Sequence, residues 1–354
     1  MRISHVVWSF TRGGLESLVV DLCNEQLARN SVQLVIVNDV VDGALIAELA
    51  PGVVVARVGR PQGSSDPRHL LRTLRALRAF SPDVLHIHQS SLAALTRWLK
   101  IPTVLTVHDT VFKGARHFRH CNKVVAISES VKASICAQAA GQEALVIFNG
   151  IRSRDIRVKQ QLRDDCFRII QVGRLELPKK GHDIAIEAMA RLVAAGLPYK
   201  ITLDFVGSGP AFQTLEAMIE TRGLRDVVRL CGAWSRARIY EALADYHLLI
   251  QPSRFEGFGL TVAEAMAAEV PVLVSNIDGP RELVADGIYG GLFAVGDAVD
   301  LARKIAEAAS DSKSAAAELK TACARRWVAE KFDVAVTARE YERTYAELVI
   351  ATGG

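Results

Sequence analysis

The sequence predicts an α/β protein made of two Rossmann-like, doubly wound domains, each with a parallel sheet. Short apolar runs alternate with helix-length segments from end to end, the 354 residues suit two domains, and 50% of them are hydrophobic. Uninterrupted apolar runs are typical of parallel strands that helices cover on both faces. Two such domains in series would face a deep interdomain cleft at the carboxyl ends of their strands.

The individual elements follow from the apolar runs and from helical periodicity. The runs that predict strands are residues 3–8, 32–37, 53–58, 84–88, 104–108, 124–127 and 145–148, then 167–172, 201–206, 227–230, 248–251, 272–275 and 292–295. The segments that predict helices include residues 16–29, 68–80, 183–195, 211–221, 299–309, 315–330 and 335–350.

The expected domain boundary lies in the window 152–165, which is the most polar window in the middle of the chain and has no apolar periodicity. We predict a first domain of residues 1–163 and a second of residues 164–334. A last helix, about residues 335–354, is expected to cross back to the first domain.

Charge is unevenly distributed between the two halves of the sequence. Residues 1–165 carry 21 Lys and Arg against 14 Asp and Glu, whereas residues 166–354 carry 22 against 25. Either the halves have different partners or the difference is chance scatter of surface charge. The segment 68–80 has leucines on one face and arginines on the other, which suits a surface helix on the sheet or a contact with anionic lipid.

Composition excludes several classes of protein. Aromatic residues make up 6% of the chain, and Lys and Arg form no groove-sized run, so we expect no nucleic-acid partner. The six cysteines include no CxxC pair, which fits a reducing compartment and argues against a zinc site. No apolar stretch reaches the roughly 18 residues of a membrane span, and no signal peptide is apparent. We expect a cytoplasmic protein, with the basic N-terminal half as the place to seek peripheral contact with the inner membrane.

The segment 173–181, GRLELPKKG, directly follows the predicted strand FRIIQV. The planar fork of Arg174 and the compact charge of Lys180 suit a diphosphate, and the start of the next helix adds a positive end. The alternative is a basic surface turn with a helix cap.

The segment 251–267, QPSRFEGFGLTVAEAMA, runs from a strand through a glycine-rich loop into a helix. Gly257 and Gly259 allow the backbone to approach a ligand closely. On one helix Glu256 and Glu264 would lie about 80° apart, so we place Glu256 in the loop, facing a sugar or phosphate, and Glu264 in the helix, facing a ribose. Otherwise Glu256 is a turn residue and Glu264 a solvated helix position.

Three further features follow strands of the first half. Gly13 and Gly14 form a turn at the start of a helix, which suits an anion. His108 ends a strand and could bond a sugar hydroxyl or act as a general base. His86 and His88 share one face of another strand. A metal cluster with His108 lacks a fourth ligand of convincing spacing, so hydrogen-bonded structural histidines are the default.

Taken together, these motifs resemble the retaining glycosyltransferases of the GT-B fold, in glycosyltransferase family 4. In the first half the matching stretches are GGLE, DVLHIH, PTVLTVHD, VVAISESVK and VIFNGI; in the second they are VGRLELPKKG, FVGSGP, EGFGLTVAEAMA, PVLVS and GPRELVADG. The two glutamates with seven residues between them, combined with Arg174 and Lys180, make the resemblance specific. It implies an acceptor-side first domain and a donor-binding second domain.

The resemblance also implies roles for individual residues. Arg174 and Lys180 would stabilise the leaving nucleoside diphosphate in place of a metal, so no cofactor is expected. Glu256 would bind the donor sugar hydroxyls, and Glu264 the ribose. Further implied donor or nucleotide contacts are Gly13, Gly14, Gly173, Gly207, Trp234, Gly257, Phe258, Gly259, Leu260 and Thr261, with His108 near the sugar O6.

The implied reaction moves a hexose-type unit from a nucleoside-diphosphate sugar to a glycan or lipid-linked acceptor, with retention of configuration. An epimerase of the same fold and a non-catalytic binding subunit are the alternatives. One departure stands at Ala268-Glu269-Val270, where the family usually has glycine after the helix. We expect Glu269 to shift the helix cap at modest energetic cost.

Overall fold

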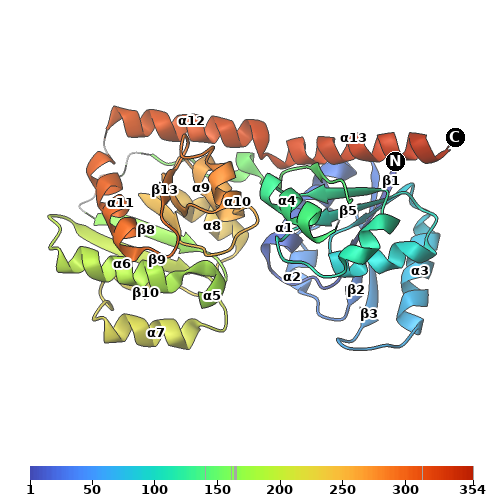
Figure 1. Cartoon of the computed structure of the whole chain (residues 1–354), viewed down its shortest axis with the longest axis horizontal. Helices are drawn as coiled ribbons and strands as arrows, with labels where there is room; N and C mark the ends of the chain where they lie inside the picture. The colour runs from blue at the N-terminus through green and yellow to red at the C-terminus, as the bar shows by residue number, and fades with distance from the viewer. Residues whose placement is uncertain (140, 161, 163–165, 313, 354) are drawn as a thin grey trace. The chain divides into compact units, whose positions relative to one another are not determined.

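The computed structural model describes residues 1–139, 141–160, 162, 166–312 and 314–353 (Figure 1). It divides into two compact units: unit 1 is Met1–Ile151 with Phe332–Gly354, and unit 2 is Arg152–Lys331. The boundary expected between residues 163 and 164 lies outside the described residues. Each unit is an α/β domain with a parallel sheet, as predicted.

Unit 1 holds a seven-stranded parallel sheet of order β3-β2-β1-β4-β5-β6-β7. Its strands are β1 (Arg2–Val7), β2 (Ser31–Asn38), β3 (Val54–Arg60), β4 (Val84–Ile87), β5 (Thr103–Val107), β6 (Lys123–Ala126) and β7 (Leu145–Val146). Its helices are α1 (Gly14–Leu27), α2 (Gly43–Ile46), α3 (Arg68–Phe80), α4 (Glu129–Gln138) and α13 (Val334–Gly353), with short 3₁₀ turns η1 (Ser90–Trp98) and η2 (Ala115–His120).

Unit 2 holds a six-stranded parallel sheet of order β10-β9-β8-β11-β12-β13. Its strands are β8 (Cys166–Val172), β9 (Lys200–Val206), β10 (Val228–Leu230), β11 (Leu248–Gln251), β12 (Val272–Ser275) and β13 (Gly291–Phe293). Its helices are α5 (Leu177–Lys180), α6 (His182–Ala194), α7 (Phe212–Thr221), α8 (Arg236–Ala242), α9 (Leu260–Ala267), α10 (Asp278–Leu283), α11 (Ala298–Asp311) and α12 (Ala315–Lys331), with 3₁₀ turns η3 (Ser153–Asp155) and η4 (Leu243–Asp245).

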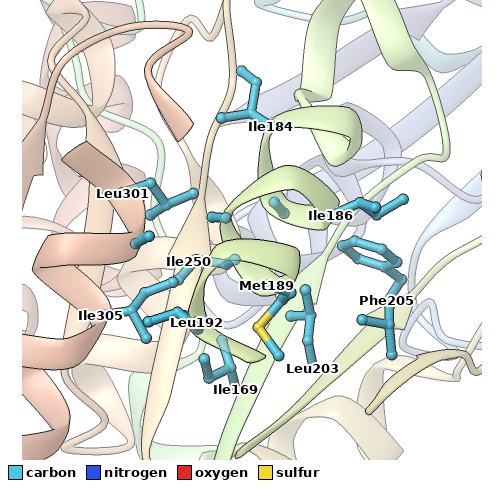
Figure 2. Close-up of a cluster of buried hydrophobic side chains, with 14 of the residues drawn as sticks. Ile169, Ile184, Ile186, Met189, Leu192, Leu203, Phe205, Ile250, Leu301 and Ile305 are labelled. Carbon is cyan, nitrogen blue, oxygen red and sulfur yellow. The ribbon is translucent and has the colours of Figure 1, made fainter. Parts of the chain in front are cut away.

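Each sheet buries both faces, as its apolar runs predict. In unit 1 the core includes Ile3, Val84 and Val104 together with Tyr341 and Tyr345 of α13, which packs beside α1. In unit 2 the strands β8, β9 and β11, helix α6 and helix α11 share one core; Figure 2 shows Ile169, Ile184, Ile186, Met189, Leu192, Leu203, Phe205, Ile250, Leu301 and Ile305. Burying each such large side chain contributes about 1.5–3 kcal/mol.

The strand order gives each sheet one topological switch point. Chain direction across the sheet reverses between β1 and β4 in unit 1 and between β8 and β11 in unit 2. In open α/β sheets, ligands bind beyond the carboxyl ends of strands at such a switch point. The glycine-rich segments singled out in the sequence follow β1, β8 and β11, so they stand at these switch points.

The charge difference between the sequence halves disappears when charges are assigned to the units. Unit 1 carries 18 Lys and Arg against 15 Asp and Glu, and unit 2 carries 25 against 24. The reason is that residues 152–165 belong to unit 2 and the acidic C-terminal segment belongs to unit 1. Local clusters of charge are therefore the better guide to partners. Within the described residues, no helix has the length and apolar composition needed to cross a bilayer.

The expected shift of the helix cap at Glu269 is wrong. Glu269 itself adopts the left-handed conformation, with φ of 59°. Its N–H bonds to the carbonyl of Met266 at 3.1 Å, and the Val270 N–H bonds to the carbonyl of Ala265 at 2.9 Å, so α9 ends in a Schellman motif. The two capping bonds hold the backbone in place, and Glu269 takes the conformation that glycine would adopt without strain.

Replacing Glu269 by glycine should therefore stabilise unit 2 by about 1 kcal/mol, because glycine avoids the left-handed strain. The matched control is Glu269→Ala, which loses the 3.3 Å ion pair with Arg325 but keeps the strain. Urea unfolding should rank glycine above alanine. Equal stability of the two variants would contradict a strained cap.

Candidate functional site

Two loops at the carboxyl edge of the unit 2 sheet are held together by close backbone approach. Gly207, after β9, has φ of 153°, and a Cβ there would overlap the carbonyl oxygen of Gly173, after β8. The Leu175 N–H donates to the carbonyl of Ser208 at 3.0 Å. Gly173 and Gly207 therefore fix the loop that carries Arg174, whose exposed side chain has no ion-pair partner among the described residues.

A second close approach brings the ends of β8 and β11 together. Gly181, between α5 and α6, has φ of 64°, and a Cβ there would overlap the carbonyl oxygen of Pro252. The Arg254 N–H donates to the carbonyl of Lys179 at 2.8 Å. The short helix α5 thus lies directly against the loop that follows β11.

This packing brings together Lys180 and Glu256, which the sequence placed at the diphosphate and at the sugar. The Lys180 ammonium and the Glu256 carboxylate form a hydrogen-bonded ion pair. Gln251, the last residue of β11, adds a long contact of 3.5 Å from Nε2 to the same carboxylate oxygen. A cation and a carboxylate therefore meet at the switch point. The Lys180 side chain is 21% exposed and the Glu256 side chain 15%, so a ligand could replace either partner.

An ion pair that sequence reasoning missed supports this arrangement. Arg254 donates from Nη1 to Asp183 Oδ1 at 3.0 Å and from Nη2 to Oδ2 at 2.6 Å, and Nη1 also donates to the carbonyl of Leu177 at 3.0 Å. Burial acts to raise the pKa of Asp183, but the Arg254 guanidinium outweighs it and holds that pKa below its usual range. The bidentate pair fastens the Glu256 loop to the α5–α6 turn.

The loop after Glu256 leads into α9 as the sequence predicts. Gly259, with φ of 108°, precedes the helix, Phe258 is buried, and Leu260 and Thr261 are its first residues, so their N–H groups lack partners within the helix. Such N–H groups, with Gly257 beside them in the loop, suit an anion. Glu264 lies inside α9 and is 93% buried, as a carboxylate with a specific partner would be.

Trp234 lies between β10 and α8, with the guanidinium of Arg238 4.1 Å from the centre of its ring. Its Nε1 is buried and has no hydrogen-bond partner among the described residues. A ligand could accept a hydrogen bond from this unpaired indole N–H.

Further unpaired polar atoms gather at the carboxyl ends of the unit 2 strands. Among the described residues, Oε1 of Gln171, Oε1 of Gln251, Oγ of Ser253 and Oγ of Ser275 are buried without a hydrogen-bond partner. Buried polar atoms are normally paired, so these unpaired atoms at the ends of adjacent strands are candidates for contacts with a ligand. Sequence reasoning passed over them; the signal was a polar residue at the end of an apolar strand.

In unit 1, Gly13 and Gly14 stand where β1 leads into α1. Gly13 is the extended residue before the helix and Gly14 is its first residue. A Cβ at Gly13 would lie 2.6 Å from Glu16 Oε2, so the carboxylate folds back over the turn. Burial raises the pKa of Glu16. The Glu16 carboxyl group next to this turn would repel an anion when it is ionised, so the turn is less suited to an anion than the sequence suggested.

His108 follows β5 and is half-buried. Burial lowers its pKa to about 4, against the opposing effect of Asp109. Its Nε2 lies 3.4 Å from Nδ1 of His88. A neutral imidazole at the edge of the sheet can bond a hydroxyl, and its low pKa makes it a weak base.

His86 and His88 lie together, with ring centres 4.0 Å apart, as their shared face predicts. His86 bonds Thr106 Oγ1 at 2.7 Å and the Tyr345 hydroxyl at 2.6 Å. The ring nitrogens of His5, His86 and His88 come within 4.8 Å of one another, a spacing that could hold a metal. Hydrogen bonds already occupy these nitrogens, so the arrangement is that of structural histidines.

A cavity of about 850 Å³ in unit 2 lies elsewhere. Its walls include Cys166, Lys200, His247 and Pro271, at the amino ends of the strands, and none of the site residues predicted from the sequence. Ligands of doubly wound sheets bind at the carboxyl ends, so we assign the site to that edge and not to this cavity.

Comparison with known proteins gives the same division of the chain. Residues 12–154 match the family model described as Glycosyltransferase Family 4, and residues 152–324 match Glycosyl transferases group 1. An uncharacterized glycosyltransferase of Methanocaldococcus jannaschii is 27% identical over 241 residues, which span 64% of this chain and 65% of the relative. The glycogen synthase of Mycobacterium tuberculosis is 28% identical over 301 residues, 78% of this chain and 71% of the relative.

Among solved structures, Anabaena HepE in complex with UDP and glucose is similar in fold, with a TM-score of 0.81, 22% identity and coverage of 98% of this chain and 100% of HepE. The two family models together match residues 12–324, and the structure has the two parallel-sheet domains of that fold. The chain therefore belongs to the GT-B glycosyltransferases, in glycosyltransferase family 4.

Proposed function

We propose that this protein transfers a hexose-type sugar from a nucleoside-diphosphate sugar to a glycan or lipid-linked acceptor in the synthesis of a cell-surface polysaccharide. The observation that carries the proposal is the meeting of Lys180 and Glu256 at the switch point of unit 2, beside exposed Arg174 and the start of α9. A diphosphate would draw Lys180 and Arg174, and the sugar hydroxyls would bond Glu256.

In the proposed reaction, the bond from the anomeric carbon to the diphosphate oxygen breaks on the face that the acceptor hydroxyl attacks. The acceptor oxygen forms the new bond to the anomeric carbon, and its proton passes to the leaving phosphate oxygen. Because attack and departure take place on the same face, the configuration is retained. Negative charge grows on the diphosphate as the old bond breaks. The two cations and the N–H groups at the start of α9 would stabilise that charge without a metal ion.

The donor is proposed to be a UDP- or GDP-sugar. The fold shared with HepE, which was crystallised with UDP and glucose, favours UDP. The base would lie near Gly207 and Trp234, where the unpaired indole Nε1 offers a donor. The ribose would bond Glu264.

The proposal is tested by incubating the full-length protein with UDP-, GDP- and ADP-hexoses, with a membrane glycolipid extract and with EDTA. We expect one donor to give an acceptor-bound sugar with retained configuration, at a rate that EDTA does not change. An isomerised sugar nucleotide formed without acceptor would instead indicate an epimerase. Donor binding without turnover would indicate a binding subunit.

We also propose peripheral contact of this cytoplasmic enzyme with the inner membrane through unit 1. The adjacent turns η1 and η2 and their flanks expose Trp98 and Val111, which are 67% and 79% exposed. The same segments carry five exposed cations: Arg97, Lys100, Lys113, Arg116 and Arg119. Apolar tips within a basic surface suit an anionic bilayer, where each cation contributes about 1 kcal/mol.

In liposome flotation, the protein should rise with vesicles that contain phosphatidylglycerol and not with pure phosphatidylcholine. Trp98→Ser with Val111→Ser should reduce flotation several-fold, while Val54→Ser, an exposed position on β3, serves as the control. Equal flotation of the double variant and the control would remove this surface from the account.

A further inference from the structure

A line of buried side chains in unit 1 leads from helix α1 to His108. Nε2 of His5, on β1, lies 2.8 Å from Oε1 of Gln26, on α1. Nδ1 of His5 lies 2.9 Å from Nε2 of His88, which follows β4, and Nδ1 of His88 lies 3.4 Å from Nε2 of His108. The strands β1, β4 and β5 are neighbours in the sheet, so the line runs from His5 within β1 to His88 and His108, which follow β4 and β5 at the carboxyl edge.

Each link in this line has a fixed direction because the imidazoles are neutral. Burial lowers the pKa of His5 and of His108 to about 4 and that of His88 well below its ordinary value. A neutral imidazole has one N–H and one bare nitrogen, and an amide oxygen only accepts. His5 must therefore donate from Nε2 to Gln26, and its bare Nδ1 must accept from Nε2 of His88. By the same step, the bare Nδ1 of His88 accepts from Nε2 of His108.

The orientation of the Gln26 amide sets the direction of the whole line. The amide oxygen Oε1 faces His5, and the amide nitrogen Nε2 is buried without a hydrogen-bond partner among the described residues. The Tyr345 hydroxyl of α13 lies 2.6 Å from Nδ1 of His86, beside this line.

We propose that Gln26, His5 and His88 are positioning residues that hold His108 in its Nε2–H form, so that its bare Nδ1 accepts a hydrogen bond from a hydroxyl of the transferred sugar. Within the described residues, Nδ1 of His108 has no partner. The last part of this inference rests on the proposed function. A bare nitrogen selects a hydroxyl donor and repels a carboxylate, so the line selects for a neutral sugar at this contact.

The test reads the tautomer directly, by long-range proton–nitrogen NMR of the full-length protein with labelled histidine. His108 should be in the Nε2–H form at neutral pH. Gln26→Met removes the acceptor but keeps the bulk, and should give a mixture of tautomers with about a tenfold loss in kcat/KM. Gln26→Glu keeps an acceptor oxygen and should restore the Nε2–H form.

The matched control is Tyr341→Phe, which removes a buried 2.8 Å hydrogen bond to Thr106 in the same cluster but outside the line. It should leave the tautomer of His108 unchanged. An Nδ1–H form in the native protein, a tautomer indifferent to Gln26→Met, or a stoichiometric bound metal that uses these nitrogens would overturn the proposal. So would a shifted tautomer with unchanged kcat/KM. Absence of any sugar transfer would reject the proposed function. The NMR spectrum would still show whether His108 is held in its Nε2–H form.

Discussion

Replacing Lys180 by alanine is expected to lower kcat/KM for sugar transfer by about 10²–10³-fold, the usual effect of removing one charge-stabilising donor. Lys180 lies with Arg174 at the switch point of unit 2, and its ammonium already pairs with Glu256 there. Without it, the leaving diphosphate keeps only Arg174 and the start of α9. Because the interaction grows as the bond breaks, kcat should fall more than KM rises.

The neighbouring lysine provides the control. Lys179 lies on the same short helix, and its carbonyl, which the substitution keeps, accepts the Arg254 N–H. Lys179→Ala should retain at least half of the native activity. Circular dichroism and the urea midpoint show whether Lys180→Ala remains folded, and the double variant with Glu256→Gln removes the carboxylate left behind. A folded Lys180→Ala protein with native kcat/KM would remove Lys180 from the reaction.

Unit 1 is expected to lose stability steeply between pH 6.5 and pH 4. Burial lowers the pKa of His5 and His108 to about 4, and those of His86 and His88 well below 6.5. Their folded pKa values lie below the unfolded value, so the unfolded state binds more protons in this window and stability falls with pH. Each histidine contributes about 1.4 kcal/mol per pH unit, so four of them would unfold a domain of ordinary stability near pH 5.

Hydrogen exchange at several pH values, corrected for the intrinsic rate, assigns this loss to a unit. Peptides from β1, β4 and β5 should lose protection as the pH falls from 7 to 5. Unit 2 is an internal reference because its sequence contains two of the nine histidines, of which burial lowers the pKa of His182 to about 4. Protection of β1 that is constant down to pH 5 would show that these histidines are not buried as described.

Much of the architecture could be predicted from the sequence because parallel strands buried on both faces leave continuous apolar runs. The run at 248–251 coincides with β11, and the run at 167–172 lies one residue inside β8. Strand ends were less predictable: residues 145–148 form only the short strand β7, Leu145–Val146. The last residues of a run extend the sheet only where a neighbouring strand is in register, which the run itself does not show.

Site residues were predictable where one short segment of the sequence carries the whole signal. They were not predictable where the contacts join residues far apart in the chain. A strand end followed by glycine and cations predicts Arg174 and Lys180 from one segment. The pairing of Arg254 with Asp183 and the line from Gln26 to His108 join residues that are far apart in the chain. Nor could the left-handed conformation of Glu269 be read from its identity, because the capping bonds and the packing of α9 override its preference.

Nucleoside diphosphate binding at Arg174 and Lys180 is the central claim, and thermal unfolding with ligand tests it most directly. We measure the melting temperature of the native protein and of Lys180→Ala in EDTA, with UDP, GDP or ADP at 1 mM. One diphosphate should raise the native melting temperature by several degrees, since a ligand at about 100 times its Kd adds about 2.7 kcal/mol, and the variant should lose most of that shift. No shift with any diphosphate, or the same shift in the variant, would contradict the assignment of this site.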